Sequence, residues 1–294
     1  MKNQMKTMVL LVTLSAIFLS LGYMLGGRSG MEYALIMSFV MNFGAYWFSD
    51  KMVLAMHQAR PIGPGHESGV YEIIQELCQK SGLPMPKVYV TPQMAPNAFA
   101  TGRDPNHAAV AVTQGILQVL DARELRGVLA HEISHVRNRD ILVSTIVACI
   151  ATAIMYLSHM MRWFGGYALR SSRDDDDRGG VNPLALILTI VLAPLVATLI
   201  QAAVSRTREY MADESGAHVC DDPEALASAL AKISDPSVLR QLGQRYELSP
   251  QLLPAVSHLY IVNHLSGDTL FSLFSTHPPV KQRIERLMAM GHSH

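Results

Sequence analysis

The sequence predicts a mainly helical fold with a small β-sheet, combined with about four transmembrane helices. Only 16% of the 294 residues are charged, and the mean hydropathy of +0.19 is high for a purely soluble chain. A bilayer crossing takes about 20 mostly apolar residues, and a charge at its centre costs about 2.5 to 3.5 kcal/mol. Four long apolar segments without a charged residue stand out, and crossings are therefore expected in 7–27, 33–49, 141–161 and 179–205.

The first two of these segments predict an N-terminal transmembrane hairpin over residues 7–49. Segment 7–27 has a basic start and could in that respect be a signal peptide. Its apolar core is long for a signal peptide, however, and a second apolar segment begins only a few residues after Arg28. An uncleaved hairpin is therefore the favoured interpretation.

The flanking residues predict the orientation of this hairpin. Tyr46, Trp47 and Phe48 directly precede Asp50 and Lys51, which is typical of an aromatic belt at a membrane interface followed by a charged flank. The basic start of the chain leads to the same orientation under the positive-inside rule. Both ends of the hairpin are expected to face the cytoplasm.

The charged stretch 50–140 predicts a helix, a small sheet and then a second helix. Residues 67–81 have the apolar spacing of an amphipathic helix that ends at a glycine. Residues 87–91 predict a strand. Residues 97–101 and 108–113 predict a hairpin, because the sequence Gly-Arg-Asp-Pro-Asn between them favours a turn.

The remaining half of the chain contains the other two uncharged segments. We expect a second transmembrane hairpin over 141–205, with a polar loop at 162–182 and a bend at Pro194. Asp174–Asp177 in this loop lacks the alternating ligands and glycine turn of a calcium loop, so a solvated loop is favoured. A second charged stretch, 206–294, follows.

Charge and cysteine content exclude several classes of protein. The chain has 24 Lys and Arg against 24 Asp and Glu, so it has no net basic field to attract nucleic acid. Cys78, Cys149 and Cys220 are odd in number and widely spaced. A disulfide scaffold and a CxxC redox pair are both excluded.

One motif in the first charged stretch points to metal chemistry. Asp121 and Glu124 form the sequence of a capping box, and the helix that they begin continues into His131-Glu132-Ile-Ser-His135. Two histidines one turn apart share a helix face and can bind one Zn²⁺, while Glu132 can reach a water held by the metal. This spacing predicts metal-assisted hydrolysis.

A catalytic zinc needs a third protein ligand. Glu209 and Asp213 lie one helical turn apart, directly after the last uncharged segment, so one can bind the metal while the other contacts a ligand. Alone, such a stretch is more typical of an interfacial anchor. Together with the histidine pair it favours a catalytic site.

These motifs, in this order, resemble the membrane-embedded zinc metalloproteases of the M48 family, and the resemblance covers the whole chain. It rests on the following segments: 96–102, His131–His135 with Asp140, Arg206–Asp213, and 275–279 with Arg283. The resemblance implies a zincin-like (gluzincin) protease domain. Its two halves, 50–140 and 206–294, would be interrupted by the second transmembrane hairpin.

The resemblance also implies a role for each matching residue. It implies that His131, His135 and Glu209 bind one Zn²⁺ per subunit and that Glu132 acts as general base and later as proton donor. It implies supporting roles as follows: Asp213, Arg283 and Asp140 orient the site, His277 stabilises the oxyanion, and Asn97, Ala98, Phe99 and Ala100 hold the substrate backbone.

The leading interpretation is a multi-pass zinc endopeptidase of the bacterial inner membrane that hydrolyses misfolded or damaged membrane proteins under stress. Its partners would be such polypeptides and the lipid bilayer. Because His131 and Glu209 must meet at one ion, both charged stretches lie on one face, expected to be the cytoplasmic one. Loop 162–182 would lie outside the cell, but it contains several arginines, which the positive-inside rule disfavours there. The alternative that the second hairpin only partly enters the bilayer therefore stays open. Rivals are an exopeptidase or prenyl-protein protease of related chemistry, and a membrane scaffold with an inactive, zinc-stabilised domain.

Overall fold

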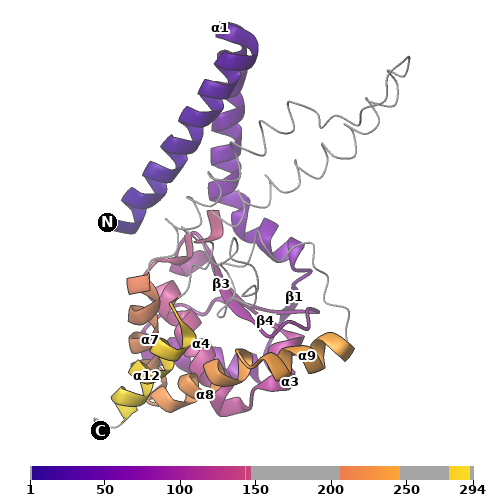
Figure 1. Cartoon of the computed structure of the whole chain (residues 1–294), viewed down its shortest axis with the longest axis vertical. Coiled ribbons are helices and arrows are strands. Elements are labelled where there is room, and N and C mark those ends of the chain that lie inside the picture. The colour runs from indigo at the N-terminus through magenta and orange to yellow at the C-terminus, as the bar shows by residue number, and fades with distance from the viewer. Residues whose placement is uncertain (1, 143, 147–205, 246–277, 292–294) are drawn as a thin grey trace.

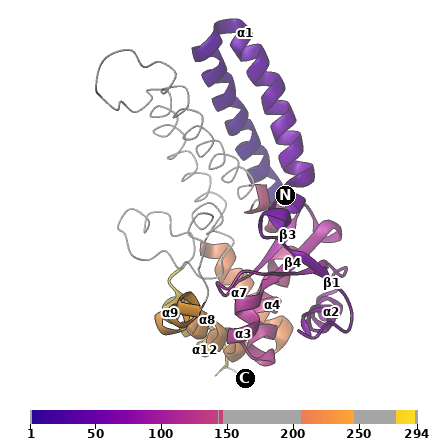
Figure 2. The ribbon, with the colours of Figure 1, turned by 90° about the vertical axis from the view of Figure 1, so that its right-hand side faces the viewer.

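The computed structural model describes residues 2–142, 144–146, 206–245 and 278–291. Within these ranges the chain is mainly helical with one small mixed sheet, as predicted. The sheet lies between an N-terminal helical hairpin and a layer of helices (Figures 1 and 2).

Helix α1 (Lys2–Met56) contains both of the first two uncharged segments and reverses direction midway (Figure 1). Gly27, the last residue of the first segment, has a φ of +59°, a conformation that glycine adopts without strain. Ser38 Oγ donates to Ser15 Oγ at 2.8 Å, so the two arms contact each other. In the part of the chain that the structure describes, no helix has the length and apolar character that a membrane crossing requires.

Several predictions for the second half of the chain lie outside the described residues. They are the span 141–161 apart from its first residues, the span 179–205 with Pro194, the loop 162–182 with Asp174–Asp177, and His277.

The sheet has the strand order β1-β2-β4-β3. Its strands are β1 (Arg60–Ile62), β2 (Lys87–Thr91), β3 (Ala98–Gly102) and β4 (Ala108–Thr113). Strand β3 pairs with β4 in the predicted antiparallel hairpin, and the short 3-10 helix η1 (Pro105–His107) lies between them. Strand β1 and the parallel pairing of β2 with β4 were not predicted. Strand β3 is thus an edge strand.

The register of β3 determines which backbone groups face outward. Thr113 N–H donates to Asn97 O, so residues 97, 99 and 101 form the hydrogen-bonded pairs with β4. The backbone N–H and C=O groups of Ala98, Ala100 and Gly102 therefore point away from the sheet. The helix α4 packs against this side of β3.

Four helices begin or end where the sequence provides a cap. They are α2 (Val70–Ser81), which ends at Gly82 with φ +65°; α3 (Gln114–Val119), capped by Thr113; α4 (Ala122–Arg137); and α8 (Pro223–Ile233), capped by Asp222. The predicted capping box of α4 is confirmed, because Glu124 N–H donates to Asp121 Oδ1 at 2.9 Å and Asp121 N–H donates to Glu124 Oε2 at 3.1 Å.

Helix α4 occupies the centre of the core and packs against α2, α7 (Arg206–Cys220) and α8. The helices α9 (Pro236–Arg245) and α12 (Val280–Gly291) complete the layer. Two glycines allow the closest approaches. A Cβ at Gly127 would lie 2.7 Å from Leu226 N, and one at Gly216 would lie 2.9 Å from His131 N. Helix α7 therefore crosses α4 directly at His131, with no space for a side chain between the backbones.

Candidate metal centre and active site

The two histidines of α4 point to one place. His131 and His135 lie on successive turns, their Nε2 atoms are 3.1 Å apart, and their rings are perpendicular with centroids 4.7 Å apart. Both nitrogens can therefore contact the same small ion.

Glu209 of α7 completes a group of three side chains that could hold a metal ion. Its Oε2 lies 3.8 Å from His131 Nε2 and its Oε1 lies 3.6 Å from His135 Nε2, and all three ligand atoms lie within 4.8 Å of one another. A tetrahedral zinc with ligands at about 2.0 to 2.1 Å separates its ligand atoms by about 3.3 to 3.4 Å. Two imidazoles and one glutamate also form a donor set that catalytic zinc sites use. The residues present fit a zinc ion.

Glu132 lies beside this group on the side of the edge strand. Ala100 N–H donates to Glu132 Oε2 at 3.0 Å, using one of the outward-facing groups of β3. Burial raises the pKa of Glu132 to about 7. The nearby charge of Glu209 also raises it, whereas His135 and the Ala100 N–H oppose the shift. A carboxyl group whose pKa lies near neutrality can both accept and return a proton.

Asp213, one turn after Glu209 on α7, supports the other side of His131. Asp213 Oδ1 lies 2.9 Å from His131 Nδ1, although the ring N–H is not aligned on the oxygen well enough for a hydrogen bond. Burial lowers the pKa of His131, and Asp213 only partly opposes this. The imidazole is therefore held neutral, which is the form that binds metal.

The negative charge of Asp213 is balanced by Arg283 of α12, which is completely buried. The pair is bidentate, because Nε donates to Oδ2 at 2.8 Å and Nη2 donates to Oδ1 at 2.6 Å. Burial alone would raise the pKa of Asp213, but Arg283 and His131 hold it below its usual value. Arg283 Nη1 also lies 3.8 Å from Glu209 Oε2. One guanidinium thus lies close to both buried carboxylates of α7, Glu209 and Asp213.

Asp140 contacts the second histidine. Its Oδ2 lies 3.3 Å from His135 Nδ1. Burial alone would lower the pKa of His135, but Asp140 and the charges of Glu209 and Glu132 raise it to about 9. Arg208 Nη1 lies 3.7 Å from Asp140 Oδ1, so Arg208 connects α7 to this aspartate.

Arg208 and Thr145 were not identified by the sequence analysis. The signal for Arg208 was its position directly before Glu209. Thr145 had no local signal, since its contacts are with the distant strand β3. Gly102 N–H donates to Thr145 Oγ1 at 3.3 Å, and the hydroxyls of Thr101 and Thr145 lie 3.0 Å apart. Thr145 therefore occupies the last outward-facing N–H of the edge strand.

The predicted substrate segment divides between two faces. Ala98 and Ala100 turn their backbone groups toward α4, whereas the Phe99 side chain packs against Val53 and Leu54 of α1. Asn97 lies buried at the start of the strand, where its N–H donates to Thr113 Oγ1 at 2.9 Å.

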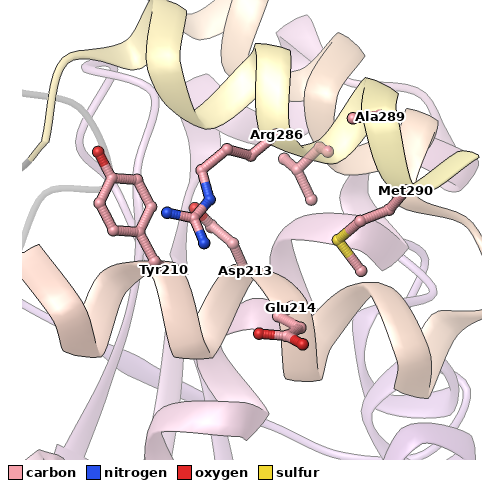
Figure 3. Close-up of a pocket in the computed structure, with 7 residues that line it drawn as sticks. Tyr210, Asp213, Glu214, Arg286, Ala289 and Met290 are labelled. Atoms are coloured by element: carbon pink, nitrogen blue, oxygen red, sulfur yellow. The ribbon is translucent and has the colours of Figure 1, made fainter.

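A cleft of about 300 Å³ lies between α7 and α12, and Asp213 is one of the residues that line it (Figure 3). The Arg286 guanidinium stacks over the Tyr210 ring at 4.2 Å, and Tyr210 Oη donates to Gln282 Oε1 at 2.9 Å. These contacts add to the Arg283 pair, so α12 is attached to α7 through several side chains.

A histidine pair on one helix, a carboxylate on a second, a buried acid and an adjacent edge strand together define a metallopeptidase. Comparison with known proteins identifies the family: the profile of Peptidase family M48 matches residues 64–290. The chain therefore belongs to peptidase family M48 and is a metalloprotease. The alternative of an inactive scaffold is not supported.

Curated relatives match nearly the whole chain. A Protease HtpX homolog of Syntrophotalea carbinolica is 51% identical over 291 residues, covering 98% of this chain and 99% of the relative. A Protease HtpX homolog of Pyrococcus furiosus is 46% identical over 293 residues, covering 97% and 96%. The crystal structure of S. mikatae Ste24p aligns with a TM-score of 0.48 at 19% identity, covering 97% of this chain and 65% of that chain.

The buried pair of Asp213 and Arg283 yields a prediction. Removing either partner leaves an uncompensated buried charge, so Asp213→Ala and Arg283→Ala should each lower the free energy of unfolding by about 3 to 5 kcal/mol. The double variant should lose less than the sum, and Arg283→Lys should not restore the loss, because an ammonium cannot form the planar two-point contact. Thermal unfolding of the purified variants measures this.

The matched control is Lys281→Ala, which removes a cation of the same helix whose side chain is 88% exposed. It should change stability by less than about 0.5 kcal/mol. Strictly additive losses for Asp213 and Arg283 would show that the two side chains do not act as a pair.

Proposed function

We propose that this chain is an integral membrane zinc endopeptidase that hydrolyses peptide bonds of misfolded or damaged membrane proteins. The observation that carries the proposal is the convergence of His131, His135 and Glu209 beside the buried Glu132 and the edge strand β3. The substrate class and the role in quality control and stress response come from the family resemblance.

His131, His135 and Glu209 would hold the ion through two imidazole nitrogens and one carboxylate. When bound, zinc would supply a Lewis acid that acidifies water and polarises the scissile carbonyl. Asp213, with Arg283 behind it, orients His131, and Asp140 orients His135. Burial, and not Asp213, keeps the imidazole of His131 neutral.

Glu132 moves the proton. Its carboxylate accepts a proton from the attacking water as the water oxygen bonds to the carbonyl carbon, and it then delivers that proton to the amine nitrogen as the C–N bond breaks. The pKa of about 7 suits both transfers. We assign His277 to stabilise the negative charge that develops on the carbonyl oxygen, because it matches the family motif in 275–279.

The outward edge of β3 would hold the substrate. An extended peptide can add to this edge through the outward-facing backbone groups of Ala98 and the carbonyl of Ala100, which needs no particular substrate side chain. Thr145 covers the next N–H, at Gly102, so the paired segment ends there. Tolerance of many sequences follows, which suits an enzyme that removes damaged proteins.

Lipid contact is supported by the apolar surface of α1. Large side chains along its second arm are highly exposed, including Tyr33 at 76%, Ile36 at 64% and Phe39 at 72%. Surfaces of this kind mark a membrane or protein interface. Together with the uncharged segments of the sequence they support four crossings, with the site facing the cytoplasm of a bacterial inner membrane.

Two substitutions test the chemistry, because one should abolish turnover with zinc retained and the other should remove zinc. Glu132→Gln keeps the shape of the side chain but cannot accept a proton, so it should retain zinc and lose at least about 10²-fold in turnover. His135→Ala removes a proposed ligand and should lose zinc itself. Zinc content after dialysis and hydrolysis of casein measure the two effects. Turnover of Glu132→Gln within about tenfold of the unmodified protein would contradict the role of Glu132.

The arrangement in the membrane has a separate test. Because His131 and Glu209 meet, cysteines introduced at exposed positions of 50–140 and of 206–294 should react with a membrane-impermeant thiol reagent from the same side. Intact spheroplasts should protect both sets, and permeabilised spheroplasts should expose both. Labelling of one set alone in intact spheroplasts would contradict an even number of crossings between the two halves.

A further inference from the structure

A second cavity, unrelated to the catalytic residues, lies where the end of α1 meets the sheet. Its volume is about 710 Å³, and none of the residues that line it belongs to the metal centre or to the Asp213 and Asp140 contacts. One wall is formed by Phe43, Trp47 and Phe48 of α1. The other walls include residues of β2, of β4 and of the turn that follows β3.

The α1 wall is aromatic. The rings of Phe43 and Trp47 are 6.0 Å apart, and all three aromatic side chains are about half exposed, with Phe48 at 50%. Three large, half-exposed rings that line one cavity favour an occupant with an apolar part.

Three cationic side chains also line the cavity. Lys51, Lys87 and Arg103 line it together with one acidic side chain, Asp50. Within the described residues neither Lys51 nor Lys87 forms an ion pair, and Lys51 Nζ instead lies 5.5 Å from the centre of the Phe48 ring. Arg103 stacks over Trp47 at 4.6 Å, and its Nε lies 3.6 Å from Asp104. The three cations outnumber the single acidic side chain of the lining, which favours an occupant that carries a negative charge.

The order of these groups along the chain identifies the occupant. The rings lie at the end of the uncharged segment 33–49, and the first cation after it is Lys51, which follows Asp50. In a bilayer this order matches the change from acyl chains to phosphates, where aromatic rings and long cationic side chains gather. We propose that this cavity binds an acidic phospholipid, with its glycerol and upper acyl chains against the rings and its phosphate between Lys51, Lys87 and Arg103. The inference rests on the membrane location proposed above.

Such a site would link the membrane to the protease domain. Arg103 directly follows Gly102, the last residue of the edge strand, and Leu54 of α1 packs against Phe99 within that strand. A lipid in the cavity would therefore contact the two elements that support the substrate strand.

Trp47 allows a direct test, because the sequence contains only one other tryptophan, Trp163. The full chain with Trp163→Phe would be reconstituted in phosphatidylcholine bilayers. These would contain a small fraction of lipid with a nitroxide near the carbonyl end of one acyl chain, with either a phosphatidylglycerol or a phosphatidylcholine headgroup. If the cavity binds an acidic phospholipid, labelled phosphatidylglycerol should quench Trp47 fluorescence more effectively than labelled phosphatidylcholine. The fraction of labelled lipid that gives the same quenching should be at least about fivefold lower for phosphatidylglycerol.

Matched variants separate the cavity from general attraction to an anionic surface. Lys51→Gln with Lys87→Gln should reduce the preference for phosphatidylglycerol by about fivefold or more, to near equality. Arg28→Gln with Arg60→Gln removes two exposed arginines that do not line the cavity, and should leave the preference unchanged. An equal effect of the two pairs would overturn the proposal.

The remaining outcomes are distinct. Equal quenching by both labelled lipids would overturn the headgroup site while leaving α1 in contact with the bilayer. No quenching by either lipid would instead contradict the proposed membrane location. Loss of the preference on addition of inorganic phosphate at constant ionic strength would show that the cavity takes free phosphate and not a phospholipid.

Discussion

The crossing of α7 over α4 at Gly216 is the constraint on which the site depends. A Cβ at Gly216 would lie 2.9 Å from His131 N, so the two helix backbones are in contact at the first histidine of the motif. From this crossing, Glu209 reaches both histidines and Asp213 reaches the back of His131. The two residue groups are more than 70 positions apart in the sequence. A larger residue at 216 would move α7 outward and separate them.

Bringing these residues together buries several charges, and the fold balances them with a few cations. Glu132, Glu209 and Asp213 are all at least 95% buried, and Arg283, fully buried, is the cation that faces the two carboxylates of α7. Metal in the site would add positive charge among the same carboxylates, so zinc should also stabilise the fold. The arrangement explains why α12, from the far end of the chain, packs against the catalytic helices.

The sequence predicted those features that depend on neighbouring residues. The capping box of Asp121 and Glu124, the helix before Gly82 and the hairpin of β3 and β4 have local causes and are confirmed. The spacing of His131 and His135 is also local, since a helix places them on one face. Glu209 required a search for a third ligand, and the choice between Glu209 and Asp213 as ligand required the family resemblance.

The features that were missed depend on contacts between distant segments. Nothing near Lys87–Thr91 indicates that this strand pairs in parallel with β4, because parallel pairing follows from the path of the chain between them. Thr145 acts on Gly102 across 43 positions, and a threonine in an apolar segment has no distinctive pattern. Arg208 is one of several arginines near Glu209, and only the packing of α7 shows that it faces Asp140.

The most direct test of the account is zinc X-ray absorption spectroscopy on the purified full chain. One zinc per chain should show a first shell of nitrogen and oxygen atoms at about 2.0 to 2.1 Å, with the outer-shell signal of two imidazoles, and Glu209→Ala should alter that shell. A sulfur shell at about 2.3 Å, which would place the zinc on cysteine, or a spectrum unchanged by Glu209→Ala would contradict the assignment of His131, His135 and Glu209 as the metal centre.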